Sequence, residues 1–457
     1  MSPKDLEQAY QKNKSRFHDY IDTIKKKAPW DIYTIINPTL IKNPYISEFP
    51  KKFFKNNKVG HGSYIEFSKI LMKYYGRNIG LLVFYLITFL LYRFSFANQK
   101  KKNPRVILDV FGLVEKTVQS GSFNENYLVG VYKVFERCNI PHAILLRPYQ
   151  QKRNPFVLVN FFKIIHQDAR DFIIEYELLR ILDFMALLRL ILFYPFKTFR
   201  LVQKEKVHED KIFNFCLKED LESFSFESLT RYILGKNLAK MDDIEKIYSW
   251  NEFQAVERGF NYGIRKSNSR VELVGLQFYL NYETYFNTVV DDLDYEMLSS
   301  PHRVLVNGKY YLQDREKVKY DVGVSLRYGD LFRFEGVEEE LNVLLLGSYA
   351  EKDTKNMLNA VRKFDNVIFK SHPAVDVSVF GKLPKNITVS SDSIYTLFKN
   401  AKVVISTASG TCTEAVACGV SVVVVASRDG LTANPLVEYG KGEIWDMAYG
   451  EDEIADA

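Results

Sequence analysis

The chain has 457 residues, of which 47% are hydrophobic and 26% are charged. These are ordinary values for a folded protein, and they exclude a disordered, collagenous or low-complexity chain. Four cysteines in this length exclude a disulfide scaffold. Cys412 and Cys418 have no neighbouring His, which argues against a zinc site. The length predicts two large domains or three smaller ones.

The net charge of +6 is unevenly spread along the chain. Residues 1–105 hold 20 Lys and Arg against 7 Asp and Glu, and the rest is net acidic. A basic segment favours an anionic partner, either nucleic acid or a membrane face. We see no helix-turn-helix pattern, RNA-recognition signature or zinc finger, so we expect no nucleic-acid partner. The first residues are polar and lysine-rich rather than a signal segment, so we expect a cytoplasmic protein.

Residues 1–104 predict a basic helical region that is interrupted by prolines. Within it, residues 79–92 form an apolar run bounded by Arg77 and Arg93. A helix of this run would be about 21 Å long, whereas a transmembrane helix needs about 20 residues. A second apolar segment spans residues 181–199. Both segments are aromatic and flanked by cations, which is typical of helices that lie in a membrane interface. The alternatives are a pair of buried core helices and a true transmembrane span.

A polar linker at residues 98–104 leads into residues 105–325, which we predict to be an α/β domain. Helical patterns dominate between its strands, notably over 157–205 and 217–260. A polar stretch at 314–336 is typical of a crossing between domains. The predicted strands of this domain lie at 106–110, 143–146, 270–278 and 303–306.

Residues 326–457 carry the clearest pattern, in which short apolar strands alternate with polar helices. This spacing is typical of a doubly wound parallel sheet. The predicted strands lie at 341–346, 367–370, 387–389, 403–406 and 420–426, and the predicted helices at 353–364, 392–400 and 413–418.

Three strand ends of this last domain carry residues suited to an anion. Ligands of an open parallel sheet bind beyond the carboxyl ends of its strands. The third of these loops precedes a helix N-terminus, where backbone N–H groups and the helix dipole favour phosphate. We therefore predict a phosphate site whose residues are Gly347, Ser348, Lys370, His372, Pro373, Ser406, Thr407, Ser409, Gly410, Thr411 and Glu414.

The run FKSHP followed by VVISTASGTCTEAVACGVSVVVV resembles the nucleotide-sugar half of glycosyltransferases with the GT-B fold. In particular, His372-Pro373 and the Ser/Thr-rich strand end resemble motifs of bacterial sialyl- and Kdo-transferases of capsule and lipopolysaccharide synthesis. The resemblance covers about residues 341–437. It implies an α/β fold with two Rossmann-like domains and, here, a basic helical N-terminal extension. The second domain, 326–457, would bind a nucleotide sugar, with a CMP-linked sugar as the first candidate and no separate cofactor.

The resemblance implies that His372 contacts the donor phosphate and that the Ser406 to Thr411 loop lines the nucleotide pocket. Residues 250–312 resemble the end of the acceptor half in surface-carbohydrate biosynthesis proteins. A transferase also needs a base for the acceptor hydroxyl. The acidic motif of sialyltransferases is not apparent in residues 105–260, so the base stays open. The catalytic candidates are Glu125, Glu257 and His372, with Asp109 at a strand end and Gln277 as a further cleft residue.

The pattern Asp292-Leu293-Asp294 matches the Asp-x-Asp metal motif of the other major glycosyltransferase fold, but no apolar strand precedes it. We expect a solvated acidic face there and no metal site. Walker A, GxGxxG, HExxH and GxSxG motifs are absent from the sequence. In the GT-B fold a C-terminal helix often crosses back to the first domain. The chain ends in GEDEIADA without such a helix, so we expect a shortened form.

These observations predict a peripheral glycosyltransferase on the cytoplasmic face of the inner membrane. Its partners would be a nucleotide-sugar donor, a glycan or lipid-linked acceptor and the membrane surface. The alternatives are a UDP- or GDP-sugar transferase, an epimerase on the same fold, and a membrane-bound polysaccharide assembly factor without turnover.

Overall fold

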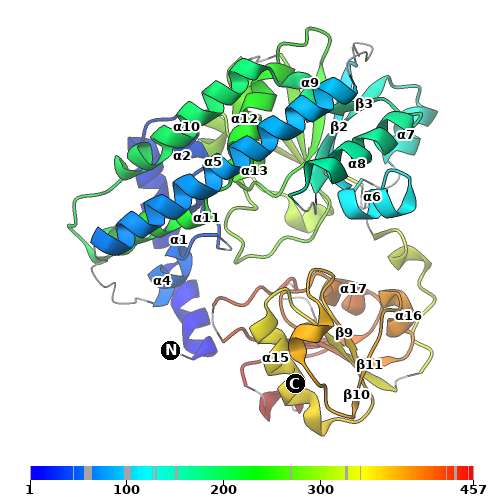
Figure 1. Ribbon diagram of the computed structural model, residues 1–457. Coiled ribbons are helices and arrows are strands. Elements are labelled where there is room, and N and C mark those ends of the chain that lie inside the picture. The colour runs from blue at the N-terminus through cyan, green and yellow to red at the C-terminus, as the bar shows by residue number, and fades with distance from the viewer. Residues whose placement is uncertain are drawn as a thin grey trace.

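The computed structural model describes residues 2–44, 46–55, 64–96, 104–125, 127–128, 131–149, 153–267, 270–324, 328–339, 341–428, 430–436, 440–450 and 452–455. The fold is α/β, with two Rossmann-like domains and a helical N-terminal extension (Figure 1). The predicted linker at 98–104 lies outside the described residues except for Pro104.

The first domain is built on a sheet of seven parallel strands among the described residues, in the order β3-β2-β1-β4-β5-β6-β7. The sequence does not predict β3, β4 and β7, because they are short and lie in stretches whose helical or polar character dominates. The strands are β1 (Val106–Leu113), β2 (His142–Tyr149), β3 (Phe172–Ile174), β4 (Lys246–Trp250), β5 (Glu272–Gln277), β6 (Arg303–Val306) and β7 (Lys319–Val322).

Helices cover both faces of this sheet (Figure 1). The closest pair is α12 and α13, where Gly235, Gly259 and Gly263 allow the two backbones to touch; a Cβ at Gly263 would lie 2.3 Å from the Tyr232 carbonyl oxygen. The helices are α6 (Val114–Ser120), α7 (Val131–Arg137), α8 (Pro155–Gln167), α9 (Glu175–Leu178), α10 (Ile181–Phe199), α11 (His208–Ser223), α12 (Phe226–Leu238), α13 (Ala255–Ser267) and α14 (Asp292–Glu296).

The second domain has a sheet of six parallel strands in the order β10-β9-β8-β11-β12-β13. The predicted strands of this domain are confirmed, two of them to the residue, because each is an apolar run between polar loops. The elements are β8 (Asn342–Leu346), α15 (Glu351–Ala360), β9 (Val367–Lys370), β10 (Ile387–Val389), α16 (Ile394–Phe398), β11 (Ala401–Ser406), α17 (Thr411–Ala417), β12 (Ser421–Val425) and β13 (Trp445–Ala448).

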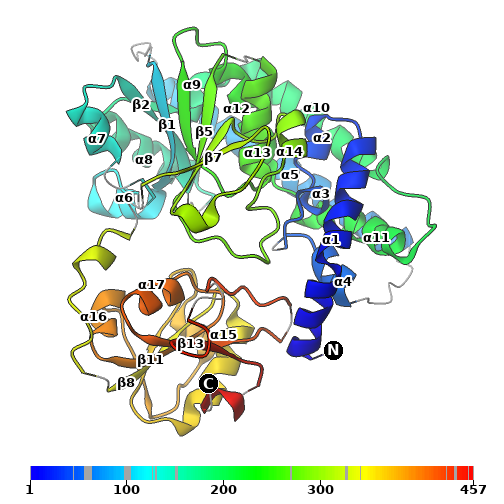
Figure 2. The ribbon, with the colours of Figure 1, turned by 180° about the vertical axis from the view of Figure 1, so that it is seen from behind.

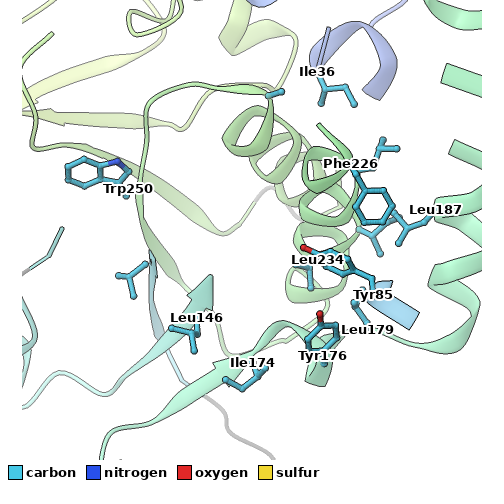
Figure 3. Close-up of a cluster of buried hydrophobic side chains, with 14 of the residues drawn as sticks. Ile36, Tyr85, Leu146, Ile174, Tyr176, Leu179, Leu187, Phe226, Leu234 and Trp250 are labelled. Carbon is cyan, nitrogen blue, oxygen red and sulfur yellow. The ribbon is translucent and has the colours of Figure 1, made fainter. Parts of the chain in front are cut away.

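The N-terminal helices pack on the first domain. Helix α5 shares one hydrophobic core with β1 and β2, in which Tyr85 and Tyr176 lie near Leu146 and Leu234 (Figure 3). Helix α1 runs beside the first domain towards the second (Figure 2), where Lys4 Nζ lies 5.9 Å from the centre of the Tyr449 ring. These helices are α1 (Pro3–Lys27), α2 (Ile32–Ile35), α3 (Pro38–Ile41), α4 (Phe49–Lys55) and α5 (Tyr64–Ser95).

Candidate functional site

The two sheets direct their switch points to a common cleft. The strand order reverses between β1 and β4 in the first sheet and between β8 and β11 in the second. Ligands of such sheets bind outside the carboxyl ends of the strands at this point. A cleft of about 900 Å³ lies there, lined by the loops that follow β4 and β5 in the first domain and by the loops that follow β8, β9, β10 and β11 in the second. The fold therefore brings strand ends from both domains to one cavity.

The second domain supplies most of the predicted phosphate residues to this cleft. The loops after β8 and β9 lie against each other, since a Cβ at Gly347 would be 3.1 Å from the backbone nitrogen of His372. Two of the three predicted loops therefore touch, and the third faces the same cavity. The predicted residues that line the cleft are Gly347, Lys370, His372, Pro373, Ser409, Gly410, Thr411 and Glu414.

His372 is held as a neutral hydrogen-bond donor. The backbone N–H of Ala374 donates to His372 Nδ1 over 3.1 Å. Burial lowers the pKa of His372 below its ordinary value, so the ring is neutral at pH 7. Because Nδ1 accepts a hydrogen bond, the proton of the neutral ring lies on Nε2. His372 thus offers one N–H group to a ligand such as a phosphate oxygen.

Lys370 and the loop after β11 add further donors. Lys370 Nζ donates to the Asp392 carbonyl oxygen over 2.5 Å, which leaves two N–H bonds of the ammonium group for a ligand. Within the described chain, the backbone N–H groups of Ser409 and Gly410 donate to no other residue. Helix α17 has only seven residues, so these loop donors contribute more than its dipole.

Glu414 lines the cleft beside these donors and accepts a hydrogen bond from the Tyr395 hydroxyl over 2.5 Å. A carboxylate at this place repels phosphate, so Glu414 fits a ribose or sugar hydroxyl better than the phosphate itself. The predicted set therefore divides into phosphate donors and one hydroxyl acceptor.

Three predicted residues do not line the cleft. Ser348 is 1% exposed, and its hydroxyl accepts the Ala350 N–H within its own loop. Ser406 is fully buried and donates to the Leu346 carbonyl oxygen over 3.1 Å. Thr407 is 2% exposed and faces the opposite side of its loop, near Arg428 and Tyr449. Ser348 therefore stabilises its own loop, and Ser406 ties the end of β11 to the end of β8.

Two of the switch-point loops contain a non-glycine residue in the left-handed region. Phe253 has φ of 53° and Ala408 has φ of 52°. Such a backbone costs on the order of 1–3 kcal/mol and persists only where the surroundings fix it. Phe253 is fully buried, and its carbonyl oxygen accepts a hydrogen bond from Arg258 Nε over 2.8 Å. Both loops are thus held in one shape.

The loop after β4 presents a carboxylate that the sequence analysis did not select. Glu252 lies in the cleft, two residues past the end of β4. Its Oε1 accepts a hydrogen bond from Trp250 Nε1 over 3.0 Å, and its carbonyl oxygen accepts one from Asn287 Nδ2 over 3.0 Å. Its Oε2 has no partner among the described residues. Gln254, Tyr149 and Tyr279 line the same wall.

The front-half candidates from the sequence lie elsewhere. Glu125 accepts the Tyr127 and Leu128 N–H groups over 2.6 and 2.9 Å, so it stabilises a turn. Glu257 is buried against Arg147 and accepts the Gln254 N–H, and burial raises its pKa to about 7. Asp109 and Gln277 are each 1% exposed and point into the domain. None of these four side chains lines the cleft.

The Asp-x-Asp pattern is not a solvated acidic face, which corrects the sequence-based expectation. Asp294 is 2% exposed and pairs with Lys25 Nζ over 3.0 Å and with Arg258 Nη1 over 2.6 Å. Asp292 accepts the backbone N–H groups of Lys317 and Glu316. Asp294 therefore joins α14 to α1 and α13, whereas Asp292 holds the backbone that leads into β7.

A loop from the first domain separates the cleft from a second cavity of about 1030 Å³ beside α1. Tyr282 and Tyr285, whose ring centres are 4.5 Å apart, line both cavities. The Tyr285 hydroxyl lies 3.5 Å from that of Tyr349, and Thr284 Oγ1 donates to the Thr432 carbonyl oxygen. This loop therefore joins the two domains at the edge of the cleft.

No protein-family model matches this chain, and no curated protein sequence matches it. Among solved structures, it is similar to a UDP-GlcNAc 2-epimerase from Methanocaldococcus jannaschii, with a TM-score of 0.39 and 12% identity over 77% of this chain and 90% of that one. It is also similar to the calicheamicin glycosyltransferase CalG4, with a TM-score of 0.38 and 12% identity over 78% and 89%.

A third similar structure is the UDP-forming α,α-trehalose-phosphate synthase from Burkholderia vietnamiensis, with a TM-score of 0.38 and 12% identity over 78% of this chain and 89% of that one.

Proposed function

We propose that this protein transfers a sugar from a nucleotide-activated donor to an acceptor that enters the cleft from the first domain. The single observation that carries the proposal is the meeting of two topological switch points at one cavity. Such points bind nucleotides and other phosphate ligands in open α/β sheets. Here one of them offers cationic and N–H donors, and the other offers a carboxylate.

The donor side fits a diphosphate or phosphate leaving group. Lys370 supplies a positive charge, His372 supplies an N–H donor, and the Ser409 and Gly410 backbone supplies two more. Donors fixed in this way stabilise the charge that develops on a phosphate as the sugar leaves. We infer a nucleotide sugar as the donor, with CMP-linked, UDP-linked and GDP-linked sugars distinguished by experiment.

The acceptor side fits a hydroxyl that must lose its proton. Glu252 stands in the cleft with one carboxylate oxygen fixed by Trp250 and the other open. A carboxylate in reach of an acceptor hydroxyl is a general base. We therefore propose Glu252 as the base, in place of Glu125 and Glu257. The tyrosines of the wall suit a sugar ring, and we propose a glycan or lipid-linked glycan of the cell surface as acceptor.

Binding of free nucleotides tests the donor site. We expect one of CMP, CDP, UDP, GDP or ADP to raise the melting temperature by a few degrees, because a ligand at 100 times its Kd adds about 2.7 kcal/mol. His372→Ala should lose most of this shift, since the ring N–H is removed from the phosphate. The measurement is a thermal-shift titration of the wild type and the variant with each nucleotide.

The matched control is His208→Ala, because His208 is exposed at the start of α11 and lines neither cavity. It should keep the full shift. A shift with CMP alone supports a sialyl- or Kdo-type donor. A shift with UDP or GDP supports a transferase whose donor is a UDP- or GDP-linked sugar. No shift with any nucleotide would contradict the proposal and favour an assembly factor without turnover.

A further inference from the structure

Helices α5 and α10 form one surface on the outside of the first domain. They lie side by side (Figure 1), and the hydroxyl groups of Tyr74 and Tyr75 donate to the carbonyl oxygens of Ile191 and Leu192. The apolar run 79–92 is only part of α5, which spans 32 residues, or about 48 Å. Within the described chain, α5 is the one helix long and apolar enough to cross a membrane.

The inner face of α5 holds the helix along the domain. Tyr74, Leu82 and Tyr92 are buried in the main core of the first domain. Polar contacts fix the helix near both ends, since Arg77 donates to the Phe224 carbonyl oxygen and the Tyr92 hydroxyl donates to Glu177 Oε1. A helix that crossed a bilayer would have to leave this core. Helix α5 therefore lies flat against its domain.

The outer faces of both helices are apolar, although they are exposed. Surface helices normally present charged and polar side chains on this face, and large apolar patches mark interaction sites. Phe94 is 84% exposed and Met185 is 69% exposed. The exposed apolar residues follow the helical repeat on both helices. They are Ile65, Met72, Gly76, Ile79, Gly80, Val83, Ile87, Leu90 and Phe94 on α5, and Ile181, Leu182, Met185, Leu188, Leu192, Phe193 and Phe196 on α10.

Exposed cations accompany this apolar surface, whereas acidic groups are few. Glu66 is the only carboxylate of α5, and Asp183 is the only one of α10. Asp183 is occupied, because its Oδ2 accepts hydrogen bonds from Arg180 N and Asn237 Nδ2. An apolar face with a cationic rim matches acyl chains below anionic headgroups. Lys73 pairs with Glu222 Oε1 over 2.8 Å. The exposed cations on and beside the two helices are Lys69, Lys73, Arg93, Lys163, Arg180, Arg189 and Arg200.

We propose that the α5–α10 surface docks in the plane of one bilayer leaflet that contains anionic lipids. A second copy of the chain fits this surface less well, because two such surfaces face to face would bring their cations together. The proposal does not rest on the nucleotide chemistry of the cleft.

Vesicle flotation of the full-length protein tests this proposal. We expect the wild type to float with vesicles of 70% phosphatidylcholine and 30% phosphatidylglycerol, and to bind pure phosphatidylcholine vesicles at least tenfold more weakly. Ile87→Glu combined with Met185→Glu should reduce binding to anionic vesicles at least tenfold, because a charge replaces an apolar contact on each helix. Arg189→Gln combined with Arg200→Gln should reduce it several-fold without altering the apolar surface.

The matched control is Phe332→Glu, which places the same charge at an apolar side chain that is 78% exposed on another part of the chain. It should float like the wild type. Melting temperature and nucleotide shift, measured on every variant, show that the fold and the cleft are intact. The proposal is overturned if the wild type stays in solution, if 500 mM NaCl removes all binding, or if the control fails equally. It is also overturned if the wild type is a dimer that Ile87→Glu with Met185→Glu converts to a monomer.

Discussion

Glu252→Gln is expected to lower turnover by about 100- to 10,000-fold, the usual contribution of a general base. The amide cannot accept the acceptor proton, but its oxygen can still accept the hydrogen bond from Trp250 Nε1, so the loop keeps its shape. Nucleotide binding should stay unchanged, because the donor residues lie on the second domain. The thermal-shift titration identifies the nucleotide that binds best, and a sugar linked to that nucleotide is used as the donor. The measurement is the rate at which the enzyme releases the nucleotide from this donor.

Glu125→Gln is the comparison that decides between the carboxylates. Its side-chain oxygen still accepts the N–H groups of Tyr127 and Leu128, and Glu125 lies outside the cleft. We expect turnover within a few-fold of the wild type. If Glu125→Gln lost turnover while Glu252→Gln kept it, the proposed role of Glu252 would be wrong.

The second large effect is expected from the buried ion pair beneath the first sheet's switch point. Asp109 Oδ2 accepts Arg231 Nη2 over 2.5 Å and Ser249 Oγ over 2.7 Å, and both charged residues are 1% exposed. Arg231→Met leaves Asp109 as an unpaired buried charge, which costs about 3–5 kcal/mol. We expect the melting temperature of the first domain to fall on the order of 10 °C, measured by thermal denaturation.

Two further variants check the cause. Arg231→Met combined with Asp109→Leu should recover most of the loss, because well-packed apolar residues often replace a buried pair without cost. The control is Arg105→Met, which removes an exposed ion pair with Glu245. This exposed pair joins the residue before β1 to the residue before β4. The control variant should change stability by less than about 1 kcal/mol. If the double variant were as unstable as the single one, lost packing rather than an unpaired charge would explain the effect.

The second domain was predictable from sequence because its strands are apolar runs that end in polar loops. Residues such as Val367 and Val422 lie in strands that are buried between two layers of helices. Because these strands are apolar throughout, the sequence predicts them as strands. The strands of the first domain are harder to predict from the sequence. Strand β4 (KIYSW) has polar residues at two of its five positions and follows a charged helix, so its residues were expected to be helical.

The missed strand explains why Glu252, the proposed base, is not selected from the sequence. Without β4, residue 252 cannot be placed at a strand end, and Glu257 is the candidate from the same stretch instead. The sequence predicts three loops at strand ends, but not which of their residues face the cleft. That choice depends on backbone conformation, such as the positive φ of Ala408, which turns Thr407 away from Ser409 and Gly410. No local sequence signal marks an alanine for that conformation.

A structure of the protein with the nucleotide that stabilises it most tests the central claim directly. We expect a phosphate oxygen about 3 Å from His372 Nε2, in the range of a hydrogen bond, with Lys370 and the Ser409-Gly410 backbone around the same phosphate. If the nucleotide were bound instead in the cavity of about 1030 Å³ beside α1, or anywhere else outside the cleft, the proposed donor site would be wrong.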